Sequence, residues 1–91
     1  RLATQRQERI RRSVPDALDL LVVCVEAGVS LDAAILRVAR DLSNVRPELA
    51  LEFAQVVRRV NAGMPRERAL LSLSQRTGVD ELRTLVARLV G

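Results

Sequence analysis

The residues of this chain best suited to chemistry are arginines near its start, because guanidinium groups bind carboxylates and phosphates in bidentate geometry. The first twelve residues hold five arginines against one glutamate, and the remaining 79 hold ten arginines and ten acids. The net charge of +4 is therefore concentrated at one end. This asymmetry favours contact with anionic membrane headgroups, nucleic acid or an acidic partner, although a solvated face has the same composition. The predicted contact residues are Arg6, Arg9, Arg11 and Arg12.

Other reactive side chains do not form a convincing site. Asp16 and Asp19 lie one turn apart and could bind a metal or act as acid and base, but a helix's first turn favours carboxylates anyway. Cys24 lies in an apolar run and is expected to be a buried, unreactive thiol. With one cysteine and no histidine, the chain predicts no disulfide framework and no zinc or haem site. We expect no catalytic residues, no metal and no cofactor.

Helix-starting and helix-stopping residues recur along the chain, and strand alternation does not. Prolines suit the first positions of helices, and glycines suit the left-handed residue after a helix. The pattern predicts a weakly amphipathic, partly frayed helix over residues 2–12, then five more helices beginning near residues 15, 30, 47, 65 and 80. The residues expected to set the turns are Pro15, Gly28, Ser30, Gly63, Pro65 and Gly78.

These elements predict an all-α, antiparallel helical bundle of about six helices with a single core. Phe53 is the only aromatic residue, so the core must be built from Leu, Val, Ile and Ala. The helix expected to begin at Pro15 is apolar nearly all round, which predicts that it is the central helix. Its apolar residues are Leu18, Leu20, Leu21, Val22, Val23, Cys24 and Val25.

Two segments 35 residues apart share one pattern of helix, Ala-Gly turn and helix start. Residues 26–36 align with residues 61–71, and seven of those positions agree in kind. The match predicts two copies of one helical hairpin, or two hairpins that converge on the same turn chemistry.

The segment Leu73–Leu85 resembles the turn of helix-turn-helix proteins, but residues 80–91 hold two acids and two arginines, which does not suit a DNA groove. No nucleic acid is therefore expected as a partner. The longest apolar run, Leu20–Val25, is far shorter than the roughly 20 residues that span a bilayer. No signal peptide is recognisable.

Three runs resemble the type II secretion system F domain family, closest to its tight-adherence (Tad) pilus form, the TadC-like platform proteins. They are Val14–Ala34, Pro47–Glu52 and Arg76–Val86, in the family's order and spacing. The resemblance covers residues 14–90.

The resemblance implies a cytoplasmic helical domain in the bacterial inner-membrane platform that couples a secretion ATPase to pilus assembly or protein secretion. Implied partners are that ATPase, another platform subunit, and the membrane through flanking transmembrane helices absent from this chain. The fragment itself would be soluble, on the cytoplasmic face. We expect residues 1–12 to be a basic juxtamembrane helix, as positive-inside charge favours, and residues 13–91 to be the helical domain.

Family members continue past a segment like Arg83–Val90 into further helical structure, so the bundle is expected to lack its C-terminal part and to expose apolar surface. Such surface predicts a homodimer. Two other function classes stay open: a helix-turn-helix regulator that binds DNA, and a peptide-binding adaptor built from helical repeats.

Overall fold

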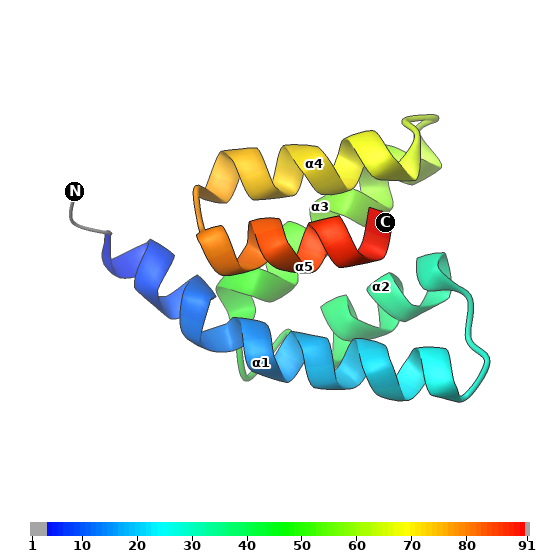
Figure 1. The fold of residues 1–91 in the computed structure, drawn as a ribbon, viewed down its shortest axis with the longest axis horizontal. Helices are drawn as coiled ribbons and strands as arrows, with labels where there is room; N and C mark the ends of the chain where they lie inside the picture. The colour runs from blue at the N-terminus through cyan, green and yellow to red at the C-terminus, as the bar shows by residue number, and fades with distance from the viewer. Residues whose placement is uncertain (1–3, 91) are drawn as a thin grey trace.

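The computed structural model describes residues 4–90, and within that range the chain folds into five α-helices arranged as an antiparallel bundle (Figure 1). The predicted all-helical fold class is confirmed, with five helices where about six were expected. The helices are α1 (Gln5–Glu26), α2 (Leu31–Asp41), α3 (Pro47–Asn61), α4 (Arg66–Thr77) and α5 (Asp80–Val90). Residues 2 and 3 of the first predicted helix, and residue 91, lie outside the described range.

The expected helix start at Pro15 is wrong, because Pro15 lies inside α1. A proline within a helix removes a backbone hydrogen bond and costs about 3 kcal/mol, and α1 changes direction part-way along its length (Figure 1). An unbroken buried stripe on both sides of Pro15 offsets this cost and keeps the segment helical. The stripe consists of Ile10, Val14, Ala17, Leu21 and Cys24. One helix thus crosses the expected boundary between residues 1–12 and 13–91, and that domain division stays a prediction.

The expectation that this segment is apolar nearly all round and buried as the central helix holds on one face only. Three of its valines are exposed: Val22 at 45%, Val23 at 62% and Val25 at 54%. The stripe above has the spacing that places one helix face against a core, and these valines lie off that face. Since α1 packs against α2, α3 and α5, it shares the central position with α3, which packs against α1, α2 and α4. Leu49 and Phe53 of α3 are fully buried.

The two predicted hairpin turns have the same geometry. Gly28 has φ +86° and Gly63 has φ +107°, a region that favours glycine. In both turns the amide after the glycine donates to a carbonyl five residues earlier at 2.9 Å, which is the Schellman arrangement. The pairs are Val29 to Cys24 and Met64 to Arg59.

The other predicted turn residues lie at helix ends. Ser30 precedes α2, and its hydroxyl accepts a hydrogen bond from the Ala33 amide at 3.3 Å. Pro65 immediately precedes α4. Gly78, with φ +65°, follows α4 and leads into α5. These turns bring the first half of α1 beside α3 and the α4–α5 turn, where the predicted arginine site lies.

Candidate functional site

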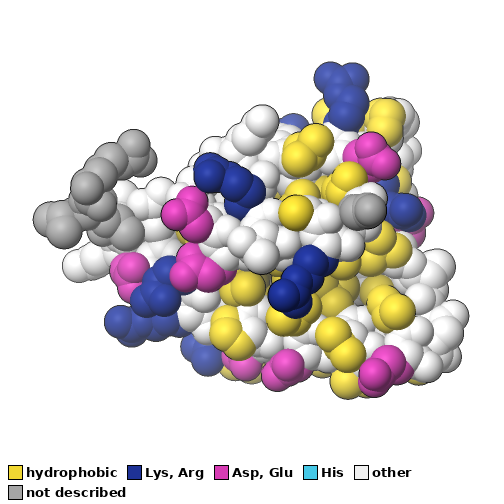
Figure 2. Space-filling model, in the orientation of Figure 1, with side chains coloured by type: hydrophobic (Ala, Val, Ile, Leu, Met, Phe, Trp, Pro, Cys, Tyr) yellow, Lys and Arg dark blue, Asp and Glu magenta, His cyan; other side chains and the backbone are white. Residues whose placement is uncertain are grey.

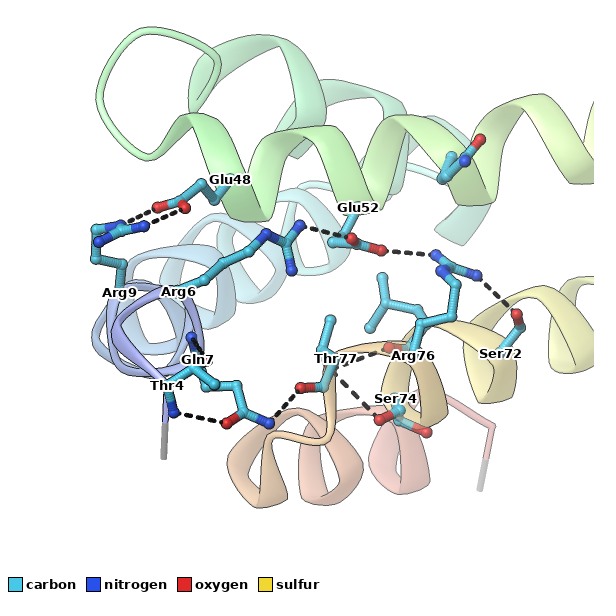
Figure 3. A network of polar contacts seen from close by, with 12 residues as sticks. Thr4, Arg6, Gln7, Arg9, Glu48, Glu52, Ser72, Ser74, Arg76 and Thr77 are labelled. Carbon is cyan, nitrogen blue, oxygen red and sulfur yellow. Dashed lines mark hydrogen bonds and ion pairs between the residues drawn. The ribbon is translucent and has the colours of Figure 1, made fainter. Parts of the chain in front are cut away.

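Two predicted arginines on α1 contact carboxylates on α3. Arg9 binds both carboxylate oxygens of Glu48, with 2.8 Å between Arg9 Nη2 and Glu48 Oε2. Arg6 lies one turn earlier on α1, and its Nη2 is 3.0 Å from Glu52 Oε2. Because Arg6 and Arg9 are three residues apart and their acids four apart, each helix presents its pair on one face. We call Arg6 and Arg9 the α1 arginines, and Figure 3 shows both extending toward α3.

Glu52 connects three helices. Only 12% of its side chain is exposed, and it accepts a hydrogen bond from Arg76 of α4 at 2.6 Å in addition to that from Arg6. Burial is the largest single influence and would raise the pKa of Glu52, but the hydrogen bonds from Arg76 and Arg6 together lower this pKa below its ordinary value. The carboxylate therefore stays charged and joins α1, α3 and α4 (Figure 3).

The other two predicted arginines pair with Glu8 of their own helix. Arg11 donates to Glu8 at 2.8 Å, one turn earlier on α1, and lies 3.8 Å from Glu81 of α5. The hydrogen bond from Arg11 lowers the pKa of Glu8 below its ordinary value. Arg12 is 4.0 Å from Glu8, and 72% of its side chain is exposed. Of the four predicted contact residues, Arg12 has the most exposed side chain.

The start of α1 is fixed by contacts that the sequence analysis did not predict. Thr4 and Gln7 form a capping box, in which each side chain bonds the other's backbone amide. The Gln7 side-chain amide also donates to the Thr77 carbonyl at 3.0 Å, at the end of α4. A Cβ on Gly78 would lie 2.9 Å from Gln7 Nε2, so glycine leaves the space that this contact occupies. The Thr-x-x-Gln spacing was the available signal for the cap, whereas the contact with residue 77 had none.

The other candidate residues, Asp16, Asp19 and Cys24, do not come together in a site. Asp16 pairs with Arg46, with 2.9 Å between Arg46 Nε and Asp16 Oδ2. Asp19 is exposed, and Cys24 is buried, with only 7% of the residue exposed. Among residues 4–90, no group of three or more His, Cys, Asp and Glu side chains is placed to hold a metal ion. No helix in this range combines the length and the apolarity needed to cross a bilayer.

The family is decided by comparison with known families, because residues 17–91 match the one described as "Type II secretion system (T2SS), protein F". The chain belongs to the type II secretion system protein F family. Searches of curated proteins and of solved structures each found no match.

The ion pairs between α1 and α3 join residues inside the segment that matches protein F to residues before it. The carboxylates Glu48 and Glu52 lie inside the matched segment, whereas the α1 arginines precede its first residue, 17. Residues before the matched segment therefore complete the helix that packs against it. The network extends the folded unit of the protein F domain to the start of α1.

Proposed function

We propose that this chain is the cytoplasmic helical domain of an inner-membrane platform protein that couples a secretion ATPase to pilus assembly or protein secretion. The observation that supports this most is the protein F family match over residues 17–91. The helical fold, with residues 4–90 in a bundle of helical hairpins, is consistent with that assignment. In this proposal the domain is a non-enzymatic scaffold, and the tight-adherence form of the family is its nearest type.

The test is an alkaline carbonate wash of membranes from cells that express the complete native gene, followed by immunodetection of this domain. The proposal expects the protein in the membrane pellet, because platform subunits are anchored by transmembrane helices. Release into the supernatant would contradict it. Co-purification of the secretion ATPase from the same genome with the complete protein, but not with one lacking residues 1–91, tests the coupling role.

The proposed contact of the N-terminal arginines with headgroups or a partner depends chiefly on Arg12. The α1 arginines and Arg11 already have carboxylate partners within the chain. Arg12→Ser should reduce sedimentation with anionic vesicles at low salt, because exposed charges are screened least under those conditions. Unchanged sedimentation would remove the membrane contact from this proposal.

We also propose that the domain associates through exposed apolar surface. Apolar side chains gather on the face between α1 and the C-terminal half of α5 (Figure 2). Leu18 and Leu85 line a hollow of about 220 Å³ there, and Val22 and Val25 are exposed along α1. Light scattering at micromolar concentration should report a homodimer that Val22→Asp with Val25→Asp converts to a monomer. A monomeric parent chain would contradict this proposal.

A further inference from the structure

A second group of arginines lies between α3 and α4, away from the contacts of α1 with α3. It lines an open hollow of about 390 Å³. The lining residues are Arg59, Met64, Arg68, Leu71, Ser72 and Gln75. Residues 68, 72 and 75 follow the spacing that places side chains on one face of α4, so their polar groups converge on this hollow.

The hydroxyl of Ser72 has unusual surroundings. Its Oγ accepts from Arg59 Nη1 at 3.2 Å and from Arg76 Nη1 at 2.7 Å, so two guanidinium groups meet one neutral oxygen (Figure 3 shows the second). With both lone pairs occupied, the hydroxyl hydrogen is left to donate. The hydroxyls of Ser74 and Thr77 donate to carbonyls of their own helix, but Ser72 donates to no acceptor among residues 4–90.

The positive charge here is not balanced locally. Neither Arg59 nor Arg68 lies within 4.0 Å of a carboxylate oxygen in the described part of the chain. Arg76 does have a carboxylate, Glu52, but shares it with Arg6. We call Arg59 and Arg68 the hollow arginines.

We propose that this hollow binds a phosphate group. The hollow arginines bind its oxygens, the Ser72 hydroxyl and the Gln75 amide donate hydrogen bonds, and Arg76 adds positive charge behind Ser72. Met64 and Leu71, the latter 47% exposed, form an apolar edge beside the polar donors. The phosphate can come from a soluble ion or ester, or from a phospholipid headgroup whose acyl chain covers that edge. This inference does not depend on the platform proposal.

The test has one arm for each source. In the first, sodium phosphate is titrated into the ¹⁵N-labelled chain at constant ionic strength, and NMR shifts of the Arg59, Ser72 and Gln75 signals are followed. In the second, the chain is sedimented with vesicles of phosphatidylglycerol or of phosphatidylcholine. Saturable shifts without a vesicle preference indicate a soluble phosphate. A preference for phosphatidylglycerol that persists in Arg12→Ser and is lost in Arg59→Gln with Arg68→Gln indicates a headgroup.

The deciding variant is Arg59→Gln with Arg68→Gln. Its matched control is Arg40→Gln with Arg58→Gln, which removes the same charge from two exposed arginines that also lie outside the chain's ion pairs within residues 4–90. In whichever arm shows binding, Arg59→Gln with Arg68→Gln should weaken it about tenfold or more. The control variant should weaken it less than about twofold. Equal losses of binding in the two double variants would show that net charge alone explains the binding, and would overturn the proposal. The absence of a saturable response in both arms would also overturn it.

A third variant tests the site without removing arginines. Ser72→Asp places a fixed carboxylate between Arg59 and Arg76, so it should abolish phosphate binding while raising the melting temperature. Retained phosphate binding in this folded variant would overturn the proposal. Circular dichroism of each variant confirms that it folds.

Discussion

The α1 arginines and the hollow arginines belong to the same residue type, yet they differ in what faces them. Arg6 and Arg9 meet Glu52 and Glu48 across a helix interface, whereas Arg59 and Arg68 line an open hollow without a carboxylate within 4.0 Å in the described structure. The first pair therefore uses its charge to hold α1 on α3. The second pair leaves its charge available to a ligand, so the density of arginines along a sequence does not by itself locate a binding surface.

Acidification should have the largest effect on the α1 side, because it protonates three carboxylates that bind arginines there. Hydrogen bonds from arginines lower the pKa values of Glu8 and Glu48 below 4.5, and for Glu52 the bonds from Arg76 and Arg6 outweigh the larger opposing effect of burial. Since each folded-state pKa lies below its unfolded value, the ion pairs stabilise the fold above pH 4.5. This stabilisation is lost as the pH falls through the folded-state pKa values.

Urea unfolding from about pH 7 down to about pH 3 measures this loss as a decrease in the free energy of unfolding, confined to the acid end. Glu52→Gln should show a shallower decrease, because one of the titrating groups is gone. A free energy of unfolding that stays level or rises on acidification would contradict the account of the α1 side.

Glu52→Gln itself should be the most damaging single change in the network. It leaves Arg6 and Arg76 without their shared carboxylate in a partly buried setting, so the free energy of unfolding at neutral pH should fall by about 1–3 kcal/mol. Glu67→Gln is the matched control, since Glu67 is exposed on α4 and forms no ion pair within residues 4–90. Similar losses for both variants would show that Glu52 does not join the helices as proposed.

The contact between Gln7 and the α4–α5 turn should have an intermediate effect, which a double-mutant cycle isolates. Gly78→Ala adds a Cβ 2.9 Å from Gln7 Nε2 and so displaces the side chain that bonds the Thr77 carbonyl. Combined with Gln7→Ala, the two changes should be less than additive by about 0.5–1.5 kcal/mol, the usual range for one hydrogen bond. Strict additivity of the unfolding free energies would mean that Gln7 and Gly78 are independent.

The smallest effect is expected at Arg12. Its side chain is 72% exposed and its only ion pair with residues 4–90 is at 4.0 Å, so Arg12→Gln should shift the melting temperature by no more than about 1 °C. Arg9→Gln, which loses a bidentate pair, should lower the melting temperature by clearly more. If Arg12→Gln is the more damaging variant, the division between paired and accessible arginines is wrong.

The sequence predicted those features of the fold that depend on neighbouring residues. Gly28, Gly63 and Gly78 lie at positive φ at the ends of helices, where a glycine is locally required. The break at Pro15 was wrong because the local penalty of proline was outweighed by burial of residues on both sides of it, from Ile10 to Cys24. That burial depends on helices from elsewhere in the chain.

The pairing of the α1 arginines was not predictable for the same reason. Arg6 and Glu52 are 46 residues apart, and Arg9 and Glu48 are 39 apart, so no local pattern connects them. The hollow arginines were missed because Arg59 and Arg68 come from different helices, so no local pattern connects them. Their convergence follows from the Gly63 turn, which was predicted, but the position of each side chain was not.

The most direct test compares the two pairs in a single set of measurements, phosphate titration and urea unfolding of Arg6→Gln with Arg9→Gln against Arg59→Gln with Arg68→Gln. The account predicts that the first double variant loses unfolding free energy and keeps phosphate binding. It predicts that the second keeps its unfolding free energy and loses phosphate binding. If both double variants lose the same property, the α1 arginines and the hollow arginines do not have the separate roles that the structure assigns them.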